Sequence, residues 1–150
     1  MKLAGPPRLH CIKRVISFTE KTRYIFEINK GIDPEESTKN PYLVNTDIPK
    51  DDCKIPFPNM IYVGDGLTDI PCFSTISHYG GTAFGVFDPA NPAIAKRAYL
   101  EFLQPHRVVG MHAPNYEKNK ELGSFLRVAV TNICNRIVVA QQTANYRPPL

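Results

Sequence analysis

The chain has 150 residues, of which 43% are hydrophobic and 21% charged, and its formal net charge is +4. This length suits one domain better than two, so we expect a single domain over residues 1–150. The charge is small and no basic run is interleaved with aromatic residues, which argues against nucleic acid as a partner. We find no apolar stretch approaching the roughly 20 residues that cross a bilayer, and no apolar core of a secretory signal. We therefore expect a cytoplasmic protein without membrane contact.

The cysteines and histidines carry no recognisable metal-binding spacing. The four cysteines are far apart and include no C-x-x-C pair, whereas a zinc site needs clustered cysteines and histidines. A domain of this size can build its core without disulfides, so we expect reduced cysteines. Cys72 follows an acidic loop, but no activating group stands near it in the sequence. We interpret it as a packing residue.

The first predicted elements are a strand, a helix and a long connection. Residues 14–18 (RVISF) are rich in β-branched residues, which indicates a strand. Thr19 and Thr22 can cap a helix that runs through TRYIFEINK, and Gly31 is placed to end it. Residues 32–59 contain five prolines and predict a loop-rich connection at the surface.

Strands and helices then alternate along the rest of the chain. Strands are predicted at residues 60–63 (MIYV), 82–87 (TAFGVF) and 107–111 (RVVGM). Helices are predicted at residues 70–79, after the capping pair of Asn91 and Pro92, and at residues 116–142. This alternation predicts parallel β-α-β units and an α/β sandwich.

The strand at residues 60–63 leads into an acidic, glycine-rich loop, GDGLTD, at residues 64–69. Asp65 and Asp69 can meet at one point as the chain turns over Gly66, and glycines let that turn run close to an ion. Mg²⁺ prefers carboxylate, water and phosphate oxygens. On pattern alone, a magnesium site and a plain turn with a helix-capping Asp69 are about equally supported.

A glycine-rich phosphate cradle is a further interpretation of the same loop. GDGLTD matches part of the G-x-G-x-x-G pattern, but the third glycine is missing. Asp65 would also set a carboxylate against the bound phosphate, which repels it. A nucleotide-binding protein is therefore the weaker interpretation.

A wider set of segments resembles one family. A lysine at a helix start, followed by a strand ending in GDG-x-TD, is similar to motifs three and four of the haloacid dehalogenase-like (HAD) superfamily. The segments TEKTRYIFEINKG, IPFPNMIYVGDGLTDIPCFS, YGGTAFGVFDP and PNYEKNKELGSFLR resemble one bacterial branch of its hydrolases. The resemblance implies a Rossmann-like three-layer sandwich with a mostly parallel sheet. It also implies a Mg²⁺-dependent phosphatase acting on a phosphorylated small molecule.

The resemblance assigns catalytic and metal-binding roles to three residues. Asp65 would bind Mg²⁺ directly, and Asp69 would bind it, often through water, or orient its shell. Lys21 matches the motif-three lysine, whose ammonium would neutralise charge between a nucleophilic aspartate and the phosphoryl group. Lys30, at the far end of the same predicted helix, is a weaker candidate.

The same frame suggests three phosphate-binding residues, Lys21, Gly66 and Thr68. Thr68 can donate or accept a hydrogen bond within the loop, although a simple capping role is the stronger expectation for it. Without the family frame, Lys21 would be interpreted as a solvated lysine at a helix end.

The family pattern begins here at its third motif. HAD phosphatases attack phosphorus with the first aspartate of a D-x-D-x-T/V motif, and the second serves as acid and base. This sequence contains no such motif, because Asp51 and Asp52 lie in a proline-flanked polar loop. We therefore expect a partial HAD-like core that lacks the N-terminal part of the fold. The strand at residues 60–63 would then have an open edge, which predicts marginal stability, self-association or a complementing N-terminal segment.

Two functions are compatible with these residues. The first is the C-terminal part of a HAD-type phosphatase, inactive by itself because the nucleophile is missing. The alternative is a non-catalytic metal-binding or interaction module derived from the same fold. Substrate identity does not follow from the sequence.

Overall fold

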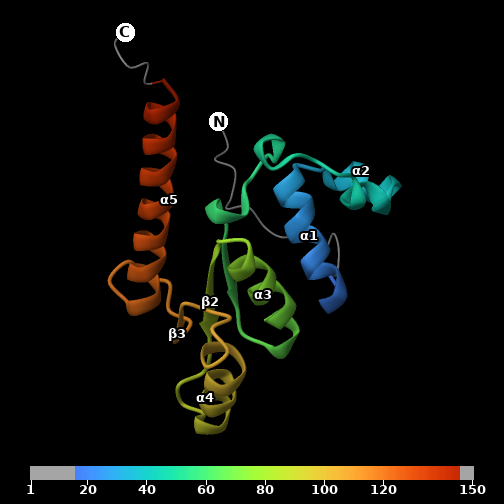
Figure 1. Cartoon of the computed structure of the whole chain (residues 1–150). Helices are drawn as coiled ribbons and strands as arrows, with labels where there is room; N and C mark the ends of the chain where they lie inside the picture. Colours follow the sequence, from blue (N-terminus) through green and yellow to red (C-terminus); the bar gives the residue numbers. More distant parts are fainter. Residues whose placement is uncertain (1–15, 146–150) are drawn as a thin grey trace, which may run out of the picture.

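The computed structural model describes residues 16–145, and Figure 1 shows how the elements are arranged. The α-helices are α1 (Phe18–Lys30), α2 (Pro34–Lys39), α3 (Ile70–His78), α4 (Pro92–Ala98) and α5 (Glu121–Asn145). The strands are β1 (Ile61–Gly64), β2 (Thr82–Val86) and β3 (Gly110–His112). The predicted α/β class is therefore confirmed.

The three strands form one open parallel sheet in the order β1-β2-β3. Residues Ile61 to Gly64 of β1 lie opposite Thr82 to Gly85 of β2. Parallel neighbours require crossover connections, and here these contain α3 and α4. Within residues 16–145, β1 pairs with no strand other than β2 and so stands at an edge of the sheet.

Helices cover both faces of this sheet, with α1 and α3 on one side and α5 on the other (Figure 1). The core on the first face includes Phe73, Ile76 and Phe102, which are 0%, 1% and 2% exposed. On the second face, Leu122 of α5 packs against Phe84 of β2. Full burial of such side chains contributes roughly 1.5–3 kcal/mol each, so these contacts hold the helices against the two faces of the sheet.

The N-terminal strand predicted at residues 14–18 is wrong over the part that the structure describes. Phe18 is already the first residue of α1, and Ser17 caps the helix, while residues 14 and 15 lie outside the described residues. The backbone N–H and the hydroxyl of Ser17 donate to the Glu20 carboxylate at 3.0 and 2.8 Å. This capping outweighs the β-branched preference of the preceding residues. The predicted helix end is confirmed, because Gly31 is left-handed with φ of 71°.

The connection over residues 32–59 is more ordered than the loop-rich segment that its prolines predict. It contains α2 and short 3₁₀ helices at Pro41–Asn45, Lys50–Asp52 and Phe57–Asn59. Asp33 caps α2 by accepting a hydrogen bond from the Glu35 N–H at 2.7 Å. The buried Ser37 hydroxyl donates to the Glu27 carboxylate of α1 at 2.6 Å, which holds α2 against α1.

The remaining predicted elements are present, with shifted ends. β1 starts at residue 61, one position later than the predicted start, and β3 starts at residue 110, three positions later than predicted. The helix capped by Asn91 is present as α4 and continues into a π-helical turn, Tyr99–Leu103. The C-terminal helix starts at Glu121, later than predicted.

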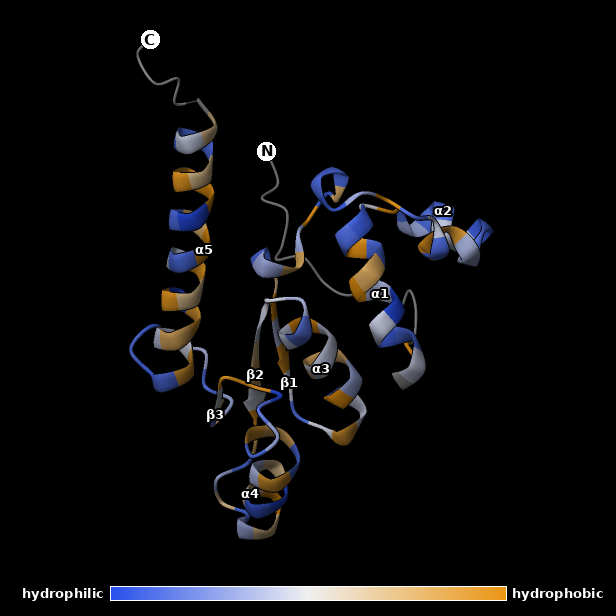
Figure 2. Cartoon of the chain, viewed as in Figure 1, coloured by the Kyte–Doolittle hydropathy of each residue, from blue (hydrophilic) through white to orange (hydrophobic). Residues whose placement is uncertain are grey.

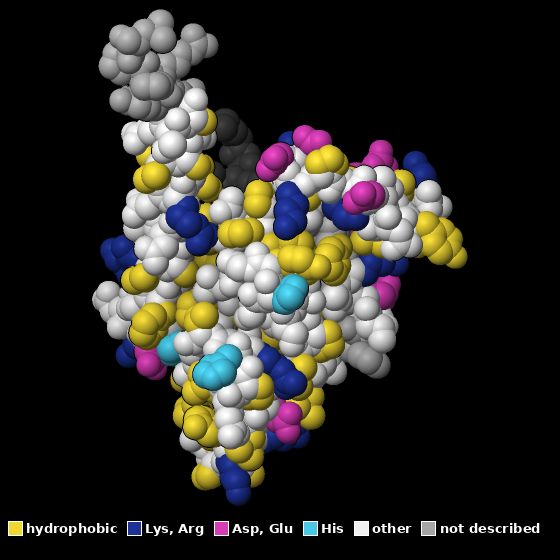
Figure 3. Space-filling model, viewed as in Figure 1, with side chains coloured by type: hydrophobic (Ala, Val, Ile, Leu, Met, Phe, Trp, Pro, Cys, Tyr) yellow, Lys and Arg dark blue, Asp and Glu magenta, His cyan; other side chains and the backbone are white. Residues whose placement is uncertain are grey.

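Helix α5 is long, apolar and mostly exposed. The segment Glu121–Ala144 is long and apolar enough to cross a membrane, and 17% of its most apolar window is buried. This corrects the expectation that no apolar stretch approaches that length, although length and composition do not by themselves establish a span. Hydrophobic residues recur along the whole of α5 (Figure 2) and stay visible on its surface (Figure 3). The exposed ones include Val128, Val130, Val138 and Val139.

Candidate functional site

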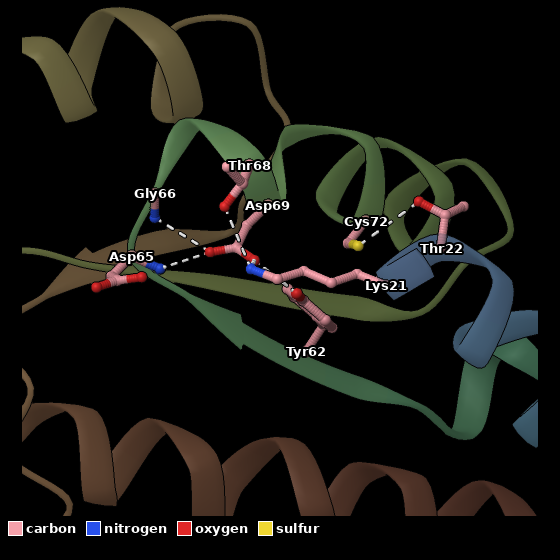
Figure 4. A network of polar contacts seen from close by, with 8 residues as sticks. All are labelled: Lys21, Thr22, Tyr62, Asp65, Gly66, Thr68, Asp69 and Cys72. Carbon is pink, nitrogen blue, oxygen red and sulfur yellow. Dashed lines mark hydrogen bonds and ion pairs between the residues drawn. The ribbon is translucent and has the colours of Figure 1, made fainter. Parts of the chain in front are cut away.

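The acidic loop lies where the sheet architecture expects a ligand. β1 ends at Gly64, the loop follows as a 3₁₀ turn at Leu67–Asp69, and α3 begins at Ile70. Ligands of open α/β sheets bind outside the carboxyl ends of the strands. All three candidate residues from the sequence, Lys21, Asp65 and Asp69, lie at or beside this end (Figure 4).

Asp69 is the centre of the network, and it is 3% exposed. Its Oδ1 accepts hydrogen bonds from Lys21 Nζ and from the Tyr62 hydroxyl, both at 2.7 Å. Its Oδ2 accepts the backbone N–H groups of Asp65 at 3.0 Å and Gly66 at 3.1 Å. A carboxylate has about four lone-pair positions, and here four donors use them. Asp69 therefore shapes the loop and holds Lys21.

Lys21 reaches the loop from a different part of the chain. It is the fourth residue of α1, and 48 positions separate it from Asp69. Its ammonium also donates to the Thr68 hydroxyl at 3.2 Å. The side chain keeps 31% of its surface exposed, so the charge stands between the loop and solvent.

Tyr62 belongs to the network and was not singled out from the sequence. It lies on β1 two residues before Gly64, so strand alternation points both residues to the same face. Its ring meets Phe73 edge-on with centroids 5.7 Å apart, and its hydroxyl reaches Asp69. The signal available in the sequence was a single polar aromatic residue in an otherwise apolar strand.

Position 64 requires glycine because the Asp69 side chain leaves no room for a Cβ atom there. A Cβ on Gly64 would lie 2.7 Å from the Asp69 Cγ and Oδ2 atoms, closer than such atoms pack. A Cβ on Gly66 would meet nothing nearer than 3.5 Å. The first glycine of GDG therefore leaves room for the Asp69 carboxylate, and the second is not sterically required.

Asp65 differs from Asp69 in its exposure, its orientation and its hydrogen-bond partners. Its side chain is exposed, and its carboxylate points away from the network (Figure 4). No described residue donates a hydrogen bond to that carboxylate. Among residues 16–145 there is no group of three or more histidine, cysteine or acidic side chains placed to hold a metal ion.

The other candidates divide between the site and its surroundings. Gly66 and Thr68 lie in the loop and contact Asp69 and Lys21 respectively. Lys30 does not lie at the loop, because its ammonium donates to carbonyl groups of the 32–59 connection. Cys72 is fully buried, with its thiol 3.7 Å from the Thr22 hydroxyl, in keeping with a packing residue.

Charge pairing sets the protonation states of the network. The hydrogen bond to Asp69 raises the pKa of Lys21 above its ordinary value of 10.5. Burial by itself would raise the pKa of Asp69, but hydrogen bonds from Lys21, Tyr62 and the Gly66 amide outweigh it and hold that pKa below 3.8. Burial, together with the bond to Asp69, raises the pKa of Tyr62 well above 10.0. At neutral pH the site therefore pairs an ammonium with a carboxylate beside a neutral phenol.

Comparisons with known proteins leave the family of this chain open. No family model matches the chain, and no solved structure matches it. An uncharacterized protein of Borreliella burgdorferi is 31% identical over 114 residues. The match covers 74% of this chain but 35% of that protein, so the chain spans about a third of the length of this relative.

Proposed function

We propose that this chain carries part of a HAD-type, Mg²⁺-dependent phosphatase core with a Rossmann-like three-layer fold, which acts on a phosphorylated small molecule. One observation carries the proposal: the Lys21 ammonium lies 2.7 Å from Asp69 at the carboxyl end of β1. At that end of the sheet, an ammonium can pair with a phosphate ester, and the acidic loop beside it can hold the Mg²⁺ that accompanies the ester. The family resemblance of these same residues gives the reaction class.

The residues present fit Mg²⁺ through Asp65. Mg²⁺ is commonly bound by one or two carboxylates, several waters and a substrate phosphate, and Asp65 offers an exposed carboxylate with no competing donor among the described residues. Mg²⁺ bound there would polarise a phosphoryl oxygen. Of the roles considered for Asp69, the four donors around it support orienting the site over direct ligation.

The proposal requires a nucleophilic carboxylate that this sequence does not contain. Among residues 16–145 one edge of β1 has no strand beside it, and an added parallel strand would find backbone partners there. We propose that a complementing segment binds there and that the chain is inactive without it. The Borreliella burgdorferi relative is longer than the matched stretch, so homologous sequence does occur within a longer polypeptide.

A metal titration tests the part of the proposal that this chain can meet by itself. Backbone amide NMR signals of Asp65, Gly66 and Lys21 should shift on addition of Mg²⁺. In Asp65→Asn the apparent affinity should fall at least fivefold, because the only free carboxylate in the loop is lost. Asp51→Asn, in the connection, is the matched control and should leave the titration unchanged. Equal affinity in Asp65→Asn and the wild type would contradict a metal site at this loop.

An activity test addresses the complementing segment. If coding sequence upstream of Met1 supplies a strand ending in D-x-D, the extended chain should hydrolyse 4-nitrophenyl phosphate in the presence of Mg²⁺. Lys21→Met and Asp65→Asn should each lower that rate at least about 100-fold, in line with loss of an electrostatic contact to the transition state. An upstream region without such a motif would remove the support for a phosphatase.

The exposed apolar surface of α5 favours a second candidate, a non-catalytic interaction module. Val138 and Val139 are 49% and 60% exposed, and Phe125, Val128, Val130 and Ile137 of the same helix are exposed as well. Exposed apolar surface of this extent favours an interaction site. Sedimentation velocity should then reveal self-association that Val139→Glu weakens. Gln142→Glu, which adds the same charge at a polar position of α5, should not. A monomer at all concentrations would exclude self-association through α5.

A further inference from the structure

A cavity lies at the opposite end of the sheet from the acidic loop. Its volume is about 370 Å³, which is within the range of small-molecule sites. Its walls include Phe57 and Pro58, which stand just before β1, and Tyr79, which stands just before β2. Since the strands are parallel, these residues mark the amino end of the sheet.

Three aromatic side chains form the apolar wall of this cavity. The rings of Phe57 and Tyr79 are stacked, with centroids 4.6 Å apart and planes 25° from parallel. Phe26 meets both of them edge-on, at 5.4 and 6.1 Å. Tyr79 is 45% exposed although the His78 ring also meets it edge-on, with centroids 5.0 Å apart, so part of this ring remains open to another planar group. On the face seen in Figure 3, hydrophobic side chains gather beside α1, with Lys or Arg side chains at their border.

Two lysines and one aspartate line the same cavity, namely Lys30, Lys50 and Asp47. Lys30 is held in place because its ammonium donates to the Val44 carbonyl at 2.7 Å and the Thr46 carbonyl at 2.5 Å. An ammonium has three N–H donors, so one remains for a ligand. Two lysines and one aspartate leave this lining with an excess of one positive charge, and the Lys30 ammonium is held in place on it.

We propose that this cavity binds a small planar aromatic anion, with the ring stacked on the Tyr79 side of the aromatic wall and the anionic group at Lys30 and Lys50. The stack supplies the shape preference and the lysines supply the charge preference, as in pockets whose few polar groups orient a ligand. The site is separate from the 64–69 loop and does not depend on the proposed phosphatase activity.

Benzoate and benzamide are matched probes, since they share the ring and differ in the charge. In amide NMR titrations of the full chain, benzoate should shift the signals of Lys30, Lys50 and Tyr79 with a dissociation constant in the millimolar range. Benzamide should bind at least fivefold more weakly. Equal binding of the two probes, no binding of benzoate, or shifts confined to α5 or to the 64–69 loop would each overturn the proposal.

Two substitutions, Lys50→Ala and Tyr79→Leu, test the location of the site. Lys50 is at the surface, so its substitution is not expected to affect folding. Lys50→Ala removes an exposed ammonium and should lower benzoate affinity about two- to fivefold, with benzamide unaffected. Lys39→Ala, an exposed lysine on α2, is the matched control and should change neither probe. Tyr79→Leu should weaken both probes, because it removes the stacking ring. A Lys50→Ala chain that binds benzoate as the wild type does would overturn the charged half of the site.

Discussion

Lys21 and Asp69 are joined by a 2.7 Å ion pair that spans 48 residues and two secondary-structure elements. The Asp69 side chain is 4% exposed and the Lys21 side chain 31%, so one partner is buried and the other is partly open to solvent. A buried carboxylate without a cation is costly, because few groups replace its hydration. The pair therefore ties the start of α1 to the 64–69 loop.

Removing the ammonium should destabilise the fold. Lys21→Met keeps the apolar stem and leaves the buried Asp69 without its cation, so the free energy of unfolding should fall by about 1–2 kcal/mol. This is below the roughly 3–5 kcal/mol expected for breaking a fully buried pair, because Lys21 is partly exposed. Urea denaturation measures the change, with Lys96→Met on the exposed side of α4 as the control. A loss no larger than that of the control would show that the pair is not stabilising.

The Tyr62 hydroxyl should contribute through one hydrogen bond. Tyr62→Phe keeps the ring packed on Phe73 and removes a donor to Asp69, so we expect a loss of about 1–2 kcal/mol. Tyr42→Phe, at a tyrosine that is 77% exposed, should cost nothing measurable. If Tyr62→Phe and Tyr42→Phe unfold at the same urea concentration, the hydrogen bond from Tyr62 to Asp69 makes no net contribution to stability.

The two glycines of GDG should tolerate alanine differently. Gly64→Ala places a methyl group 2.7 Å from the Asp69 carboxylate, which we expect to cost about 1–3 kcal/mol through overpacking. Gly66→Ala has space and a φ of −128° that alanine adopts, so its cost should be below about 1 kcal/mol. Thermal unfolding of both variants makes the comparison. A larger loss of stability in Gly66→Ala than in Gly64→Ala would mean that the loop requires glycine for its backbone conformation and not for lack of space.

The lowered pKa of Asp69 predicts acid sensitivity with a definite sign. Its folded pKa lies below the ordinary 3.8, so its contribution to stability is fully present above that value and is lost as pH falls through the folded pKa. The difference in unfolding free energy between wild type and Asp69→Asn should therefore be constant from pH 7 to about pH 5 and shrink below pH 3.8. The difference would not shrink if Asp69 acted only through packing. Should Asp69→Asn not fold, the carboxyl pKa can be measured in the wild type by NMR.

Much of the fold could be predicted from local patterns. The apolar run before GDG, the capping Asn91 and the terminating Gly31 each mark an element through its own residues and their backbone preferences. The strand predicted at residues 14–18 failed because Ser17 and Glu20 cap a helix there. Two competing local signals overlapped at that point, and the capping interaction prevailed.

The candidate site was less accessible to such reasoning. Asp65, Asp69 and Lys21 were predicted, but their different situations depend on which oxygen meets which donor, and that is a tertiary property. Tyr62 was missed because its partner lies across a turn. Whether Asp69 had lone pairs to spare could be judged only with all its donors in place.

Helix α1 connects the acidic loop with the aromatic cavity. Lys21, near its start, is fixed to the 64–69 loop, and Lys30, at its end, is fixed to the connection beside the aromatic cavity. A 13-residue helix is a rigid rod about 20 Å long. Because both anchors stand on that one rod, a shift of the helix along its axis would disturb both contacts at once. A ligand that moved Lys30 would therefore also act on the Lys21–Asp69 pair, through the position of this one helix.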